Sequence, residues 1–268
     1  VLVTTERQMS IQRFTAAHEL GHFFMRHEPS LDDESMLRRM PTSFESGRNF
    51  QEAEADAFAV MFMMPKWLIL MHAGRQGWRQ DDFQHPSIVY QASLRLGASY
   101  EATCRTLGRY NLISSSTVSE LLKQRPRELK ANLLGHYTPP NYKGDVWLLT
   151  EKDAGACIEG SRNDTFVLKL NEDSGGGYLW NFDQLTDSGF AIVCDNQTAI
   201  NPDGIGGPVV RQVTAVVEAA HHGHISIHEK RPWQPADTIA NLTFNYDVTG
   251  PEPVGLSRAE RRARLEAA

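Results

Sequence analysis

Cysteine is scarce in this sequence of 268 residues, and no cysteine stands near another. Cys104, Cys157 and Cys194 show neither the C-x-x-C spacing of metal or redox sites nor the even number of a disulfide framework. Reduced thiols of this kind are typical of the cytoplasm, where we expect the protein. The opening residues VLVTT are strand-like and lack an initiator Met, so we expect the natural N-terminus to lie upstream.

Long apolar runs and excess positive charge are also missing. No uninterrupted apolar run approaches the ~20 residues of a membrane-spanning helix, and no charged and then apolar leader opens the chain. The formal net charge of -6 would repel a phosphate-rich surface on average. Residues 74–130 carry a mild basic excess, but helical hairpins explain this stretch better than a DNA-binding helix-turn-helix. We therefore expect neither membrane binding nor direct DNA binding.

The first half of the sequence has helical patterns. Apolar residues three and four apart predict a helix over residues 11–27, with Ser10 as its N-cap. An Ala-, Met- and Phe-rich run predicts a second, buried helix over residues 50–65. Weaker helical patterns lie near residues 87–96, after Ser99, and around Thr117 and Glu120, which have capping-box spacing, up to an interruption at Pro126.

The second half changes to strand patterns. From about Val146, short alternating or β-branched runs are separated by Gly, Pro, Asn and Asp, which predicts an antiparallel sandwich. The paired prolines within residues 135–145 predict a semi-rigid linker between the two halves. His222, His224 and His228 share one side of a strand, with His221 beside them. We expect a solvated strand face there in preference to a second metal site.

The stretch RFTAAHELGHFFMRH, residues 13–27, contains the pattern H-E-x-x-H. Four residues of helix rise about 6 Å and slightly exceed one turn, so His18 and His22 project from one face and can bind one zinc ion. Glu19 stands roughly 100° round the helix, where a general base is needed. Zinc acidifies water and a carboxylate moves its proton, so the pattern predicts hydrolysis. The alternative is that both histidines are ordinary helix residues.

A third metal ligand would decide between these alternatives, and the second helix offers candidates. Glu52 and Asp56 share one face with the small residues Ala55 and Ala59, which would let the two helices approach closely. We predict Glu52 as the third ligand and Asp56 as an acceptor that orients a ligand imidazole. Glu54 points roughly 200° away and is the alternative third ligand. Three protein ligands leave a fourth position for water, as in catalytic zinc sites.

These two blocks resemble the ImmA/IrrE family of metallopeptidases. RFTAAHELGH and EAEADAFAVMFMMP are similar to the family's RFT-x-AHELGH, its E-x-x-A-(N or D)-x-F-A and its apolar run ending in Met-Pro. The resemblance covers about residues 1–125, and relatives carry more chain before the zinc helix. It implies a zinc peptidase that cleaves a helix-turn-helix transcriptional repressor after stress or DNA damage, with His18, His22 and Glu52 as ligands and Glu19 as the catalytic base.

A second resemblance covers about residues 146–249. GYLW at 177–180, GIGG at 204–207 and RPW at 231–233 are similar to the chagasin family, whose immunoglobulin-like sandwiches inhibit papain-like cysteine proteases with three loops. Where chagasins usually have Asn-Pro-Thr-Thr, this chain has Asp173–Gly176, so we expect the domain to hold a substrate or sense a partner. Trp180 is expected in the core. The resemblance implies partner-binding loops with Gly177, Tyr178, Gly206, Gly207, Arg231, Pro232 and Trp233.

The expected fold is therefore a multidomain chain with a mainly α, α+β zincin-like peptidase domain, a helical extension and a C-terminal all-β immunoglobulin-like sandwich. The expected function is a zinc-dependent endopeptidase that cuts an intracellular regulatory protein, above all a transcriptional repressor. The alternative is a protein-binding regulator whose sandwich captures or inhibits another protein, with a structural or sensory metal. The expected boundaries are 1–80 for the peptidase, 81–135 for the extension, 146–250 for the sandwich and 251–268 for a charged helical tail.

Overall fold

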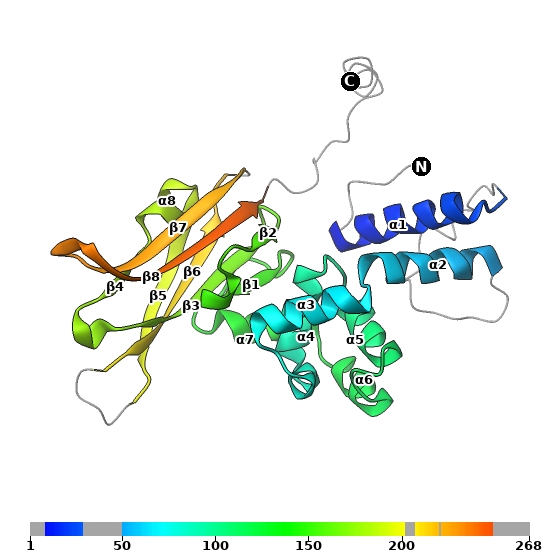
Figure 1. Cartoon of the computed structure of the whole chain (residues 1–268), viewed down its shortest axis with the longest axis horizontal. Coiled ribbons are helices and arrows are strands. Elements are labelled where there is room, and N and C mark those ends of the chain that lie inside the picture. Colours follow the sequence, from blue (N-terminus) through cyan, green and yellow to red (C-terminus); the bar gives the residue numbers. More distant parts are fainter. Residues whose placement is uncertain (1–8, 29–49, 202–206, 220, 249–268) are drawn as a thin grey trace, which may run out of the picture.

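The computed structural model describes residues 9–28, 50–201, 207–219 and 221–248. Within these ranges helices come first and strands follow (Figure 1). The strand-like opening, Gly206 and the expected helical tail at 251–268 lie outside the described residues. The helices of the first half are α1 (Met9–Met25), α2 (Phe50–Met63), α3 (Lys66–Gln76), η2 (Gln80–Gln84), α4 (Pro86–Arg95), α5 (Tyr100–Arg109), α6 (Ser115–Leu121) and α7 (Pro126–Leu134).

The second half contains two sheets, as the strand patterns predict. Its elements are β1 (Val146–Leu149), η3 (Glu151–Asp153), β2 (Cys157–Glu159), β3 (Thr165–Glu172), η4 (Ser174–Gly176), β4 (Leu179–Asn181), α8 (Asp183–Asp187), β5 (Phe190–Ala199), β6 (Val209–Val217), β7 (His222–Arg231) and β8 (Gln234–Asp247).

Helix boundaries follow the predicted patterns with three corrections at the caps. Ser10 lies inside the first turn of α1 and is not its N-cap. Ser114 caps α6 by accepting a hydrogen bond from the Thr117 N–H at 3.1 Å, so the predicted capping box starts three residues too late. Pro126 begins α7 and does not interrupt a helix, because the first helical position needs no N–H partner.

Small residues hold α1 against α2. Gly21 and Ala55 are buried where the helices meet, and a Cβ atom at Gly21 would lie 3.1 Å from the Ala55 Cα. Ala59 is fully buried one turn further along α2. The two helices lie side by side at one end of the molecule (Figure 1). The predicted close approach is therefore present, and it brings the polar faces of both helices together.

The strands form a sandwich of two four-stranded sheets, in the orders β1-β3-β6-β5 and β2-β8-β7-β4. Six strands pair in antiparallel fashion, but the edge strands β1 and β2 pair in parallel with β3 and β8. The prediction of a purely antiparallel sandwich is wrong at these two edges. Leu149, Phe166, Trp180, Ile225 and Phe244 are among the residues that fill the space between the sheets. Trp180 lies in the core, as expected.

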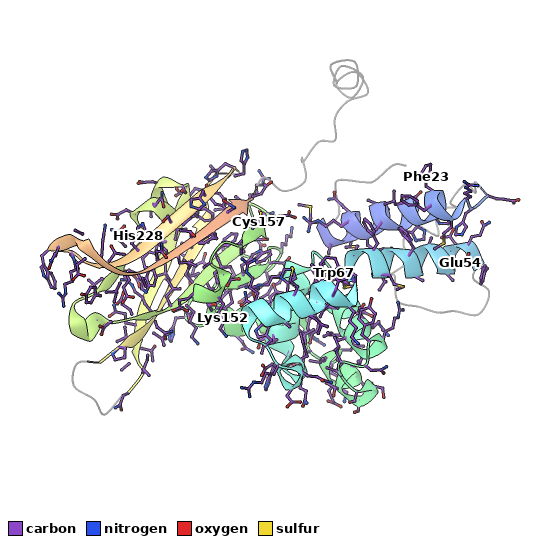
Figure 2. The ribbon with its side chains drawn as sticks, viewed as in Figure 1. Phe23, Glu54, Trp67, Lys152, Cys157 and His228 are labelled. Carbon is purple, nitrogen blue, oxygen red and sulfur yellow. The ribbon has the colours of Figure 1, made fainter. Side chains whose placement is uncertain are left out.

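Helices α3, α4 and α7 pack directly on the sandwich half. One apolar cluster joins α3 to α7 with Val146 of β1 and Val167 of β3. Gln91 on α4 extends the edge of the sheet, because its Nε2 donates to the Val146 carbonyl at 2.8 Å and its Oε1 accepts from the Leu148 N–H at 2.9 Å. Lys152 (Figure 2) donates to the Gln76 carbonyl at 2.7 Å. Helices and sandwich thus form one continuous packed body.

One apolar stretch runs through α2 and α3. Phe50–Gln76 is 27 residues long with a mean hydropathy of 1.4 in its most apolar window, so by length and composition alone it could cross a membrane. Helices of soluble proteins pass the same test, and this stretch breaks at Met64 and Pro65 into two helices. Large apolar side chains are exposed on α1, α2 and α3, and they include Phe23, Phe24, Phe50, Met61, Phe62 and Trp67. Figure 2 labels Phe23 and Trp67.

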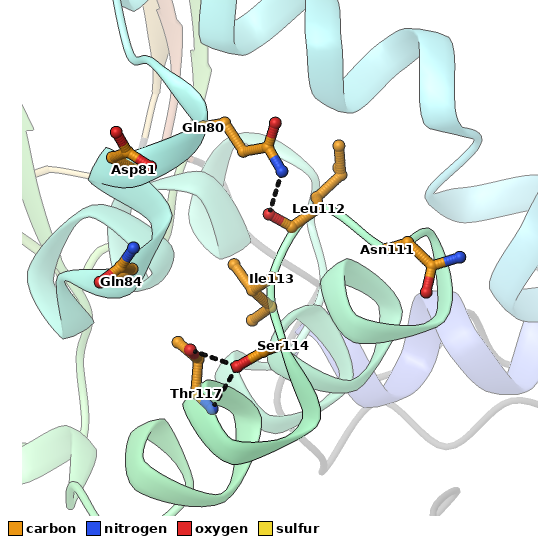
Figure 3. A pocket seen from close by; sticks show the side chains of 8 residues that line it. All are labelled: Gln80, Asp81, Gln84, Asn111, Leu112, Ile113, Ser114 and Thr117. Atoms are coloured by element: carbon orange, nitrogen blue, oxygen red, sulfur yellow. Dashed lines mark hydrogen bonds between the residues drawn. The ribbon is translucent and has the colours of Figure 1, made fainter.

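Two cavities lie away from the α1–α2 contact. One of about 350 Å³ lies between η2 and the start of α6, where Gln80 Nε2 donates to the Leu112 carbonyl at 3.1 Å beside the Ser114 cap (Figure 3). The other, of about 270 Å³, is lined from the helices by Arg13, Arg75 and Arg95 and from the sandwich by Trp147 and Glu159. Arg13 of α1 forms an ion pair with Glu159 of β2 across it.

Candidate metal centre

Three polar side chains converge between α1 and α2. The His18 Nε2 atom lies 3.0 Å from His22 Nε2 and 3.2 Å from Glu52 Oε2, and Glu52 Oε1 lies 3.4 Å from His22 Nε2. Of all the His, Cys, Asp and Glu side chains in the described ranges, only these form a group of three or more whose donor atoms lie within 4.8 Å of one another. The structure therefore brings together the three residues that the spacing predicts as metal ligands.

The donor geometry fits zinc. Zinc ligands at about 2.0–2.1 Å on tetrahedral corners are separated by roughly 3.3–3.4 Å, close to the 3.0–3.4 Å separations of these atoms. Two imidazole nitrogens and one carboxylate form the donor set of several catalytic zinc sites. With three corners taken by the protein, a fourth remains for water. Glu54, the alternative third ligand, does not join this group.

Asp56 contacts the first histidine. Its Oδ1 atom lies 2.9 Å from His18 Nδ1, which places the proton of the neutral imidazole on Nδ1 and leaves the Nε2 lone pair facing Glu52 and His22. Burial lowers the pKa of His18, but the hydrogen bond and charge of Asp56, together with the charges of Glu52 and Glu19, outweigh burial and raise this pKa overall. The site therefore favours positive charge at this position.

Glu19 lies beside the three donors without joining them. It is half-buried on α1, and its charge is felt at His18. A carboxylate beside a metal site can take a proton from water. Consecutive helix residues are offset by roughly 100°, so Glu19 and His18 start from neighbouring faces of α1.

A further histidine, which sequence reasoning missed, touches the site. His27 Nδ1 lies 2.9 Å from His22 Nδ1, and His27 Nε2 lies 3.2 Å from Glu54 Oε2. His27 follows His22 by five residues, which is not a helical spacing, so no sequence pattern connects the two histidines. The chain leaves the helix at Arg26, and no local pattern predicts that a non-glycine residue turns the chain there.

The sandwich brings together four of the predicted partner-binding residues. Gly177 has φ +80°, and a Cβ atom there would lie 2.6 Å from the ring of Trp233. The Arg231 guanidinium lies 4.4 Å from the centre of the Tyr178 ring, and Arg231 Nε donates to the Gly176 carbonyl at 3.2 Å. Trp233 is 71% exposed. The turn after β3 and the turn between β7 and β8 therefore form one surface with an exposed aromatic ring.

The other predicted loop residues contribute less to this surface. Pro232 is exposed beside Trp233, and Gly207 is exposed with open space around its Cβ position. The turn between β7 and β8, orange in Figure 1, lies at the end of the long axis opposite to α1 and α2.

The clustered histidines of β7 have separate partners. His224 Nδ1 lies 3.0 Å from Asn245 Oδ1, and His228 Nε2 lies 3.1 Å from Ser226 Oγ. Within the described part of the chain they do not form a second metal-binding group. The expectation of a polar strand face agrees with these contacts.

Comparison with known proteins identifies two regions. Residues 6–108 match the IrrE N-terminal-like domain of the M78 peptidases, and residues 160–248 match the chagasin family peptidase inhibitor I42. Over 103 residues the chain is 28% identical to Amoebiasin-2 of Entamoeba histolytica, covering 37% of this chain and 83% of that protein. Both family matches confirm the resemblances seen in the sequence.

Two solved structures are also similar. The cysteine protease inhibitor EhICP2 from Entamoeba histolytica shares 24% identity, covers 40% of this chain and 99% of its own, and has a TM-score of 0.34. PbICP-C in complex with falcipain-2 shares 13% identity, covers 41% of this chain and 95% of its own, and has a TM-score of 0.27.

Proposed function

We propose that this chain, which carries an IrrE N-terminal-like domain followed by a chagasin-family inhibitor domain, is a zinc metalloendopeptidase that binds a partner protein through its sandwich. The convergence of His18, His22 and Glu52 between α1 and α2 carries the peptidase assignment. Its substrate is an intracellular regulatory protein, above all a transcriptional repressor. The three cysteines are free thiols, which supports a cytoplasmic location.

Each residue of the centre has a distinct task in peptide hydrolysis. Bound zinc would lower the pKa of water and polarise the substrate carbonyl. His18 and His22 would hold the ion through Nε2, and Glu52 would hold it through its carboxylate. Glu19 takes the proton of the attacking water and passes it to the leaving amine. Asp56 keeps the His18 ring in the orientation that this task requires.

Glu19→Gln tests the peptidase assignment. Zinc-loaded protein is incubated with the repressor encoded beside its gene, and any new terminus is mapped by mass spectrometry. We expect cleavage by the wild type, loss of cleavage in Glu19→Gln, and about one zinc per chain in both proteins. Glu28→Gln, at an exposed glutamate just after α1, is the matched control. Wild-type protein that binds no zinc after reconstitution would contradict the assignment.

A second candidate function for the sandwich is inhibition of a cysteine protease. The family match and the exposed Trp233 beside Gly177 and Arg231 favour it, because exposed aromatic and arginine side chains anchor protein interfaces. The loop Asp173–Gly176 lacks the threonines usual in chagasins, so another protein partner is the alternative. Titration of papain with the full chain and with Trp233→Ala decides between them: inhibition that needs Trp233 supports the protease partner, and no inhibition supports the alternative.

A further inference from the structure

The chain reverses direction at the end of α1, and the reversal places His27 against the metal centre. Arg26 has φ +56°, a left-handed conformation that usually belongs to glycine. The His27 N–H donates to the His22 carbonyl at 3.1 Å, and the Arg26 N–H donates to the Phe23 carbonyl at 3.2 Å. This closing pattern folds the chain back on the last turn of the helix. His27 therefore lies next to His22 although it is five residues away.

The side chain of His27 is more buried than either histidine of the predicted ligand set. It is 6% exposed, compared with 17% for His18 and 21% for His22. The His22 and His27 rings meet edge to face, with centres 4.9 Å apart. A buried imidazole needs partners for both nitrogens. His27 has one partner in His22 and the other in Glu54.

One assignment of protons satisfies every atom of this chain of contacts. If His22 presents the Nε2 lone pair to a metal ion, its Nδ1 carries the proton and donates to His27 Nδ1. His27 then carries its own proton on Nε2 and donates it to the Glu54 carboxylate. Both imidazoles are neutral in this assignment, and each donor meets an acceptor.

The two predicted histidine ligands are then supported by α2 in different ways. Asp56 reaches His18 directly. Glu54 is two residues from Glu52, roughly 200° round the helix, so it reaches His22 only through His27. His27 is not itself a candidate ligand. In the described ranges, the group of three side chains whose donor atoms lie within 4.8 Å of one another contains His18, His22 and Glu52, and His27 does not belong to it.

We propose that His27 and Glu54 are positioning residues that hold His22 as a zinc ligand, through the relay Glu54–His27–His22. The proposal rests on the proposed zinc centre and concerns metal affinity, whereas the catalytic role of Glu19 is separate. Removal of such outer partners typically weakens metal binding 10- to 100-fold.

Zinc affinity in competition with a chromophoric chelator tests the relay, with far-UV circular dichroism as the folding check. His27→Phe keeps a ring but no acceptor, and we expect about 10- to 100-fold weaker zinc binding. His27→Gln offers an amide oxygen to the His22 Nδ1–H and should recover part of the loss. Glu54→Gln should show a smaller loss, and Asp56→Asn is the reference for the His18 side. If His27→Phe does not fold, His27→Gln and Glu54→Gln carry the comparison.

Histidine NMR gives a second readout that a purely structural role would not change. In the zinc-loaded wild type, the Nδ1–H signal of His22 should exchange slowly with water, and this protection should be lost in His27→Phe. Wild-type affinity and unchanged protection in the His27 variants, with a loss in Asp56→Asn, would overturn the relay alone. Wild-type protein that binds zinc but cuts no substrate would overturn the peptidase function alone, and weaker zinc binding in the His27 variants would still support the relay.

Discussion

The buried ion pair between Arg95 and Asp153 should couple the unfolding of the helices to the unfolding of the sandwich. Arg95 on α4 is 5% exposed, Asp153 in η3 is 1% exposed, and their charged atoms lie 2.9 Å apart. The guanidinium also lies 5.7 Å from the ring centre of Trp78 and 6.0 Å from that of Trp147. The pair therefore joins the two halves of the chain inside their shared interior.

Asp153→Ala would leave the guanidinium buried without its carboxylate. Loss of one partner of a buried pair costs about 3–5 kcal/mol. Asp153 also accepts from Gln76 Nε2 at 2.6 Å and from the Thr150 N–H at 2.9 Å, so the upper part of this range is expected. The double variant Arg95→Leu with Asp153→Leu should recover only part of the loss, because apolar replacement of both charges is often near neutral but the Gln76 and Thr150 donors stay without their acceptor.

Urea unfolding, followed by far-UV circular dichroism and by tryptophan fluorescence, measures these differences. We expect one transition that coincides in both probes, and a lower midpoint in Asp153→Ala. Glu120→Ala removes an exposed pair with Lys123 and should change stability by less than about 1 kcal/mol. Separate transitions for the helical and tryptophan signals, or a loss below about 1 kcal/mol in Asp153→Ala, would refute the reasoning.

Three further predictions concern other parts of the chain. Burial, and then the charge of Asp145, raises the pKa of Asp164 from 3.8 to about 6. The folded state therefore holds the Asp164 proton more tightly than the unfolded chain, and the stability that this proton contributes falls as pH rises from about 4 to about 6. Wild type should lose up to about 3 kcal/mol relative to Asp164→Asn over that interval in urea titrations, and parallel pH curves would contradict this. Gly21→Leu should push α1 away from α2 and weaken zinc binding more than 10-fold in chelator competition. Ala16→Leu, at an exposed position of α1, is the control, and an unchanged zinc affinity in Gly21→Leu would count against the close-packed centre. Trp233→Ala should leave the thermal midpoint unchanged because the ring is 71% exposed. If the sandwich binds papain, calorimetry should show at least 10-fold weaker binding in this variant, and equal affinities would disprove the loop assignment.

Local spacing accounts for what the sequence predicted well. The four-residue spacings of His18 with His22 and of Glu52 with Asp56 fix one face on each helix, and the small Ala55 lets those faces meet. These relations hold within a few turns of helix, so tertiary context does not alter them.

The features that local sequence patterns did not predict depend on contacts between distant segments. His27 joins the site because Arg26 adopts a left-handed conformation, which is uncommon for an arginine. The parallel pairing of β1 with β3 depends on how the chain crosses between the sheets. Gln91 and Val146 meet across 55 residues, and neither residue carries a local pattern that announces the contact.

The continuous interior from α3 to the sandwich keeps the candidate metal centre and the β7–β8 turn apart. The metal centre and the turn between β7 and β8 lie at opposite ends of its long axis, with packed helices and sheets between them (Figure 1). Under the proposed function, a captured protein would therefore be cut by the same molecule only if it is long enough to span that body. Under the same proposal, a compact partner seated on the loops would be reached only by the metal centre of a second molecule, so its cleavage rate would rise with the square of the protein concentration.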